Sequence, residues 1–275
     1  MRQVAPALVV SLLGAAAVRA DGLADLRACL ATLAARDPIR ATVTVEVRPL
    51  PDPKAAKDAA KPEPVRITVE ASAGDGAVTV TAPPELLAAL RKEGEERREG
   101  KRTGSPLRSA LDDARVDALA SILDAGGALA ERLAGAAAVR ESADSFRGAA
   151  ARLLVLKPVS ELDEEARKHV KNLKEELLVW VGADGCPLAT ERASEGKFRF
   201  MVISAEFRMR SHREYARLGD RLVVTREETE ASGEGMGEQS RDAVTVTVVP
   251  HPPDGAAAPH PASQIPVGSP AGGPG

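Results

Sequence analysis

Aromatic residues are scarce in this chain of 275 residues, which contains one Trp, one Tyr and four Phe. Surfaces that stack nucleic-acid bases or sugars use several exposed aromatic rings, often beside a basic patch. The formal net charge is −3 at pH 7, because 37 Lys and Arg stand against 40 Asp and Glu. We therefore expect no nucleic-acid partner.

Residues that build catalytic and metal sites are also few, with two Cys and four His. Glu165 and His169 have the spacing that places two ligands on one helix face, but two ligands are too few for a zinc site. Ser194 and Lys197 match the Ser-x-x-Lys pattern of penicillin-recognising enzymes, yet the accompanying Ser-Asp-Asn and Lys-Thr-Gly motifs do not occur. We expect no metal, no cofactor and no catalytic residue, and predict that the chain is not an enzyme.

Long apolar runs are confined to the N-terminus. Residues 1–20 read MRQVAPALVVSLLGAAAVRA, with Arg2, an apolar core, and small residues before Asp21. This layout is typical of a secretory signal peptide, and its apolar core is shorter than the roughly 20 residues of a membrane-spanning helix. We expect an exported, soluble protein, periplasmic or secreted, without a transmembrane helix in the mature chain.

The two cysteines, Cys29 and Cys186, leave several interpretations open. The sequence LRAC at residues 26–29 resembles a lipoprotein cleavage motif, but charged residues separate it from the apolar core, and charge in an inserting segment is costly. Leucines recur at spacings of three and four over residues 23–33, which predicts an amphipathic helix that carries Cys29 beside its apolar stripe. Export would also permit a disulfide between Cys29 and Cys186, and the sequence does not decide whether it forms.

Alternation of apolar and polar residues predicts strands on both sides of a helical block. Residues 39–47, 65–71 and 77–82 alternate, and Asp-Gly between the last two is a strong hairpin signal, so we expect three antiparallel strands. Residues 84–135 begin with proline, contain a charge run and continue as Ala/Leu-rich sequence, which predicts a helical insertion.

Strands are expected again after this insertion. The predicted ranges are 138–144, 150–158, three strands within 176–210, then 220–230 and 242–249. Turns are expected at 183–185 and 194–196, and a change of apolar phase between Phe200 and Ile203 predicts a bulge. Ser160 and Asp163 have the spacing of a capping box for a short helix.

These patterns predict one α+β domain over residues 21–250, between the signal peptide at 1–20 and a Pro-, Gly- and Ala-rich tail at 251–275 that we expect to be disordered. The domain is expected to be a curved antiparallel sheet, or half-barrel, of about eight to ten strands. Its helices are expected on the concave face.

Two segments carry a resemblance to a known family. LLVLKP at 153–158 and VWVGADGCPLATER at 179–192 resemble the strand, helical connector and Asp-Gly hairpin of LolA/LolB-type lipoprotein carriers, and the order of elements over residues 22–250 is similar in outline. The resemblance implies an exported half-barrel whose concave face and covering helices enclose an apolar cavity for acyl chains. Those carriers line the cavity with aromatic residues, whereas this chain offers chiefly Val, Leu and Ala.

The function expected from these features is non-enzymatic binding or carriage of an apolar ligand, a lipid or a lipoprotein acyl chain, in the bacterial envelope. The candidate lining residues are Val43, Val45, Val69, Val80, Trp180 and Phe207. One alternative is that these side chains only fill a core, as buried apolar residues usually do. Another is an envelope protein without a cavity, a structural or interaction module whose sheet edge or tail engages another protein.

Overall fold

A computed structural model describes residues 21–33, 37–50, 63–74, 76–101, 106–158, 164–200, 203–235 and 238–251. The predicted signal peptide, the capping box at Ser160 and Asp163, and the tail beyond residue 251 lie outside the described residues.

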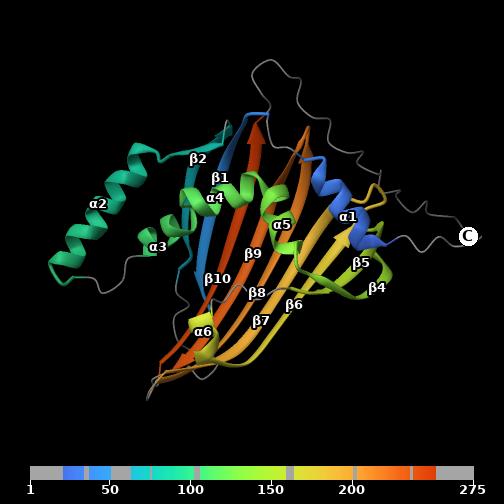
Figure 1. Cartoon of the computed structure of the whole chain (residues 1–275). Helices are drawn as coiled ribbons and strands as arrows, with labels where there is room; N and C mark the ends of the chain where they lie inside the picture. The colour runs from blue at the N-terminus through green and yellow to red at the C-terminus, as the bar shows by residue number, and fades with distance from the viewer. Residues whose placement is uncertain are drawn as a thin grey trace, which may run out of the picture.

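The described residues form six helices and ten strands (Figure 1). The helices are α1 (Gly22–Ala31), α2 (Pro84–Arg98), α3 (Pro106–Asp113), α4 (Val116–Leu123), α5 (Ala125–Leu133) and α6 (Glu164–His169). The strands are β1 (Ile39–Pro49), β2 (Val65–Gly74), β3 (Ala77–Thr81), β4 (Ala137–Phe146), β5 (Ala149–Lys157), β6 (Val170–Val181), β7 (Pro187–Phe200), β8 (Ile203–Leu218), β9 (Arg221–Gly235) and β10 (Glu238–His251).

All ten strands join one antiparallel sheet, and the predicted α+β class with a curved half-barrel is confirmed. The strand order is β3-β2-β1-β10-β9-β8-β7-β6-β5-β4, so β1 pairs with β10 and the sheet remains open at β3 and β4. Figure 1 shows the helices α1, α4 and α5 on one side of the sheet. None of the described helices is long and apolar enough to cross a membrane.

The predicted order of elements is largely confirmed. The three N-terminal strands are β1 to β3, and the helical insertion is the run from α2 to α5. The turn expected at 194–196 is wrong, because β7 continues through these residues to Phe200. Gly196 has a packing role: a Cβ there would lie 2.8 Å from Cζ of Phe207, so the ring on β8 occupies the space of the missing side chain.

The bulge expected between Phe200 and Ile203 is also wrong, because these residues belong to two neighbouring strands, β7 and β8. The change of apolar phase therefore marks the end of one strand and the start of another. A register shift is present farther along β8, between Glu214 and Tyr215.

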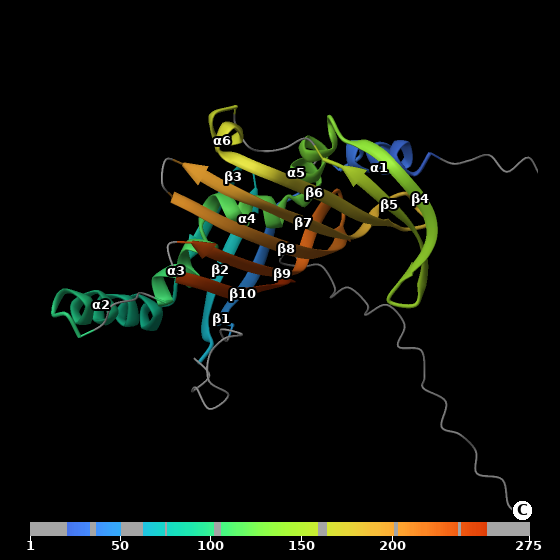
Figure 2. The same ribbon diagram turned by 90° about the horizontal axis from the view of Figure 1, so that it is seen from below.

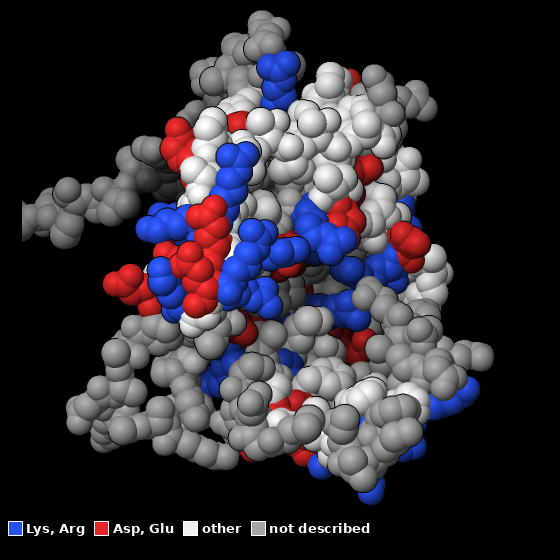
Figure 3. All heavy atoms as spheres, turned by 90° about the vertical axis from the view of Figure 1, so that its left-hand side faces the viewer, with Lys and Arg blue, Asp and Glu red and all other residues white. Residues whose placement is uncertain are grey.

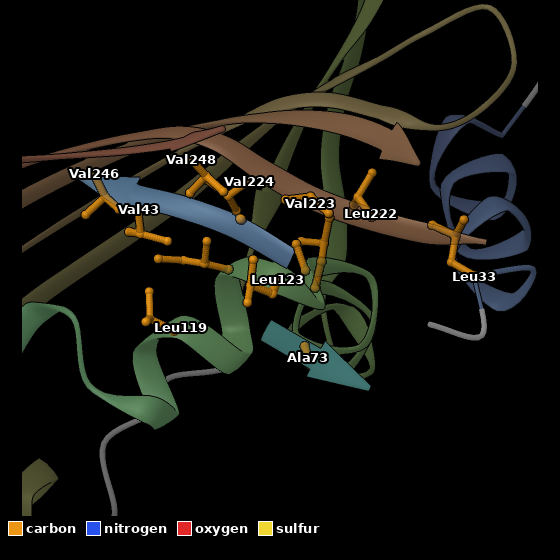
Figure 4. Packing of buried hydrophobic residues seen from close by; sticks show 14 of the residues in the cluster. Leu33, Val43, Ala73, Leu119, Leu123, Leu222, Val223, Val224, Val246 and Val248 are labelled. Atoms are coloured by element: carbon orange, nitrogen blue, oxygen red, sulfur yellow. The ribbon is translucent and has the colours of Figure 1, made fainter. Parts of the chain in front are cut away.

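The core lies between the sheet and the helices on its concave side. Val43 of β1 and Val69 of β2 are fully buried there, and Leu119 and Leu123 of α4 pack over the same part of the sheet (Figure 4). Burial of each such side chain stabilises the folded state by roughly 1.5–3 kcal/mol. Helix α2, in contrast, extends away from the sheet in two perpendicular views (Figures 1 and 2).

Helix α1 is held at several points. Asp21 caps its N-terminus by accepting hydrogen bonds from the backbone N–H groups of Leu23 and Ala24, which are otherwise without helical acceptors. A disulfide joins Cys29 of α1 to Cys186 in the turn between β6 and β7, and both cysteines also belong to the core. Of the interpretations of Cys29, the structure combines the helix and the disulfide.

Candidate functional site

The register of the strands shows which side chains share the helix-covered face of the sheet. One row of directly opposed residues begins and ends in the core; it consists of Val246, Glu227, Arg213, Thr190 and Val179. Residues two positions along each strand form the next row on the same face, since side chains alternate with a period of two. The helix-covered face can therefore be followed row by row from the core to the free ends of the strands.

A polar belt crosses this face where the core ends; we define it as Glu175, Arg192, Ser211, Arg213 and Glu227. Arg192 forms an ion pair with Glu175 at 3.0 Å, and Arg213 forms one with Glu227 at 2.9 Å. The four side chains are between 11% and 17% exposed, so these pairs are shielded from solvent far more than ordinary surface pairs. Ser211 donates a further hydrogen bond to Glu227 at 3.1 Å.

Two neutral side chains continue the polar belt toward the core. The hydroxyl groups of Thr190 and Tyr215 are hydrogen bonded at 2.8 Å. Burial raises the pKa of Tyr215 above its usual value near 10.

A small hollow of about 210 Å³ lies between helices α3 and α4 and strands β8 to β10. Asp113, Ser121, Arg213 and Glu227 contribute to its wall. Burial raises the pKa of the Asp113 carboxyl, and the negative charges of Asp112 and Glu227 raise it further.

We expect Asp113→Asn to stabilise the protein at neutral pH. A carboxyl whose pKa is raised on folding stabilises the folded state fully below its unfolded-state pKa, near 3.8, and loses that contribution as the pH rises through the folded-state pKa. The amide does not ionise, so the thermal midpoint should rise modestly at pH 7 and be unchanged near pH 3. Thermal unfolding at both pH values measures this, and an equal shift at both would contradict the assignment.

Beyond the polar belt, the strands continue past helices α4 and α5 and border a second, larger hollow of about 900 Å³. We call it the distal hollow; its wall includes Glu175, Ser194, Phe207, Met209, Ala231 and Arg241. Ala231, Met209, Ser194 and Glu175 form one row of the helix-covered face, and Phe207 lies in the following row. Met209 is 36% exposed, which is high for a large apolar side chain.

Charged residues of the alternate rows, which face away from the helices, also contribute to the wall of the distal hollow. Lys174 and Arg208 both pair with Glu195, at 2.7 and 3.7 Å, and all three contribute to the wall of the distal hollow. Figure 3 shows blue and red side chains interspersed on one side of the molecule, without a large surface of a single sign. Such a surface of mixed charge favours the binding of neither a polyanion nor a polycation.

The structure does not gather the six candidate lining residues into one pocket. Val43, Val45 and Val69 are core residues beneath the helices, and Val80 on the edge strand β3 packs against the same core. Trp180 is opposed to Leu153 and Ala189 on the other face of the sheet. Phe207 is the single candidate that borders the distal hollow.

The expectation of one cavity lined by all six is therefore corrected, because half of them are covered by helices that pack directly on the sheet. Met209 and Ala231 were not expected as lining residues. The alternation of Phe207 and Met209 in the sequence could have indicated their common face, but the sequence carried no sign that helices α4 and α5 stop short of them.

An aromatic cluster lies on the face opposite the helices. Phe146, at the tip of the β4–β5 hairpin, and His212 of β8 both lie near Trp180, with ring centroids 6.1 Å from that of Trp180. The indole Nε1 of Trp180 donates a hydrogen bond to Asp144 at 3.0 Å, and Arg147 pairs with Glu214 at 2.6 Å. The hairpin tip is thus fastened across β6 and β8.

The positions of the residues in the Ser-x-x-Lys pattern and in the Glu165/His169 pair show whether these patterns could form a catalytic or metal site. Ser194 faces the helices, whereas Lys197, three residues along the strand, lies on the other face and pairs with Glu206 at 3.0 Å. The ring of His169 packs near Phe198, and the side chain of Glu165 lies outside the described residues. The described residues contain no group of three or more His, Cys, Asp or Glu that could hold a metal ion.

No protein-family model matches the sequence, and no curated protein matches it.

Proposed function

We propose that the protein is an exported, non-enzymatic binder or carrier of an apolar ligand with acyl chains, and that the ligand lies in the distal hollow. The observation that carries the proposal is the apolar strip formed by Phe207, Met209 and Ala231, which continues the helix-covered face beyond helices α4 and α5 and borders about 900 Å³ of space. Ligand sites in proteins are typically concave and of about this volume.

The polar belt supports this location. Its two shielded ion pairs, Arg192–Glu175 and Arg213–Glu227, separate the packed core from the distal hollow. An acyl chain that entered the core would have to displace these charged groups, and separating shielded ion pairs is costly. The ligand is therefore expected to leave the core and its packing unchanged.

The disulfide supports the proposal of export. Cys29 and Cys186 are bonded to each other, and structural disulfides persist in oxidising compartments such as the periplasm or the extracellular space. The resemblance to LolA/LolB-type carriers agrees with this compartment and with a ligand that contains acyl chains.

We expect the protein purified from the periplasm of an expressing bacterium to carry bound lipid. Native mass spectrometry should show an added mass of lipid size that disappears after organic extraction, and incubation of the extracted protein with phospholipid micelles should restore it. A bare mass after both treatments would contradict the proposed function.

We expect Met209→Glu to weaken the binding of a fluorescent fatty acid about tenfold or more, because it places a charge against the apolar strip. The matched control is Leu87→Glu on α2, which also introduces a carboxylate at an exposed large apolar residue but lies away from the hollow. Fluorescence titration measures both dissociation constants. Equal affinities in the two variants would show that the ligand does not bind in the distal hollow.

A second candidate function is an interaction module without a ligand cavity. The specific observation in its favour is strand β4, which lies at one edge of the sheet and is exposed along almost its whole length.

A further inference from the structure

Strand β4 presents an open sheet edge. It is the last strand in the order of the sheet, and nine of its ten residues are exposed, so its outer backbone groups face solvent. Among the described residues, β5 is the only strand paired with it. An exposed edge of this length is a template for pairing with another strand, and proteins usually block such an edge with charges, bulges or a covering element.

The side chains of β4 divide into two sets. Glu141 points to the helix-covered face, where its carboxylate accepts a hydrogen bond from the backbone N–H of Gly22 at 3.1 Å and lies 3.6 Å from Arg152. Arg140 and Asp144 lie on the opposite face. The carboxylate of Asp144 is held in place by Trp180, and both Arg140 and Asp144 are exposed beside the open edge.

A second copy of the chain can pair with β4 only in certain registers. In a two-fold symmetric antiparallel pair, directly opposed residues must share a face of the joined sheet. The symmetry axis therefore passes midway between one residue and the same residue of the other copy. Each register is thus named by its central residue. Centres at Arg140, Glu141 or Asp144 place identical charges directly opposite each other, which is destabilising.

The centre at Ser142 has the reverse effect. It places Arg140 of each copy directly opposite Asp144 of the other, so symmetry creates two ion pairs on the same face. It also places Glu141 opposite Ala143, and thus separates the two Glu141 carboxylates, which are already engaged within their own chains. A centre at Ala143 would forgo both ion pairs, since Arg140 would then lie opposite Phe146.

We propose that β4 is a homodimerisation edge, at which two copies of the chain pair antiparallel about Ser142 and join their sheets, with Arg140 of each copy opposite Asp144 of the other. The bulge between Ala138 and Arg140 ends the regular part of the strand and limits the pairing to a short central segment. The interface is therefore small, and the dimer is weak and concentration-dependent.

Sedimentation velocity of the full exported chain, from about 1 µM to about 1 mM, tests the association. The wild type is expected to shift from monomer to dimer across this range. Arg140→Asp places Asp opposite Asp144 in both halves of the interface and is expected to raise the dissociation constant about tenfold or more. Arg140→Asp combined with Asp144→Arg restores opposite charges and is expected to recover most of the affinity.

The matched control is Arg98→Asp, which makes the same charge change at an exposed residue of α2 and is expected to leave dimerisation unchanged. A wild type that stays monomeric at the highest concentration overturns the proposal. Equal weakening by Arg140→Asp and Arg98→Asp also overturns it, because net charge rather than register would then control association.

The register itself is tested by mild oxidation. In the proposed pairing Ser142 lies directly opposite its own copy, so Ser142→Cys is expected to form a covalent dimer rapidly. Ala143→Cys lies opposite Glu141 and is expected to cross-link much more slowly. Faster cross-linking at Ala143→Cys, or none at either position, overturns the proposed pairing. Circular dichroism of each variant confirms that the fold is retained.

Discussion

Removal of the disulfide by Cys29→Ala combined with Cys186→Ala is expected to lower the free energy of unfolding by about 3–5 kcal/mol. The bond links residues 157 positions apart, and closing so long a loop removes much conformational entropy from the unfolded chain. It also fastens helix α1 to the turn between β6 and β7, where Gly185 approaches the backbone of Asp25 closely.

Urea unfolding of the wild type and the double variant, each with and without dithiothreitol, measures this loss. Reductant is expected to bring the wild type close to the double variant and to leave the double variant unchanged. A wild type whose midpoint is insensitive to reductant would contradict the result. Such an outcome would mean that the helix contacts, including the ion pair between Asp25 and Arg152, suffice to hold α1.

Much of the fold follows from local alternation in the sequence. Strands β1 and β2 each present one row of small or branched apolar residues to the helices and one polar row to solvent. The sequence shows this directly, because apolar and polar residues alternate along both strands. The helical insertion was equally visible, since Pro84 begins α2 and Ala- and Leu-rich sequence follows.

The candidate site was harder to predict because it depends on relations between distant strands. The sequence around Gly196 predicts a turn, yet the lack of a side chain at Gly196 accommodates Phe207 of the neighbouring strand. Trp180 alternates with Val179 and Val181, and the sequence alone does not indicate which set faces the helices. The polar belt was not expected, since its members are charged residues that become shielded only when β6 to β9 lie side by side.

The belt also limits how the molecule can act. A half-barrel with apolar residues along its whole concave face would allow a ligand to reach the core. Here the ion pairs of Arg192 and Arg213 divide that face. The packing that stabilises the fold therefore lies under the helices, and residues that line the distal hollow can be substituted with little effect on stability. Substitutions at Met209 are therefore expected to alter binding with little effect on unfolding.

The buried arginine Arg221 supports the packed half of the molecule, and Arg221→Leu is expected to lower the free energy of unfolding by about 3 kcal/mol or more. Arg221 is 3% exposed, and its side chain donates hydrogen bonds to two backbone carbonyls, that of Asp37 before β1 and that of Leu123 at the end of α4. Its charge also lies at the C-terminus of α4, where a cation is favoured. Leucine would remove the donor from the buried hydrogen bond to the carbonyl of Leu123.

Arg217→Leu is the matched control, because Arg217 is exposed near the same β8–β9 turn and donates a hydrogen bond to the carbonyl of Gly219. It should change stability by less than about 0.5 kcal/mol. Arg221→Lys should fall between the two, since an ammonium keeps the charge but cannot reach carbonyls on two sides as the planar guanidinium does. Urea unfolding ranks the three variants. Equal losses in Arg221→Leu and Arg217→Leu would show that loss of charge at this turn, and not the link between α4, β1 and β9, determines the effect.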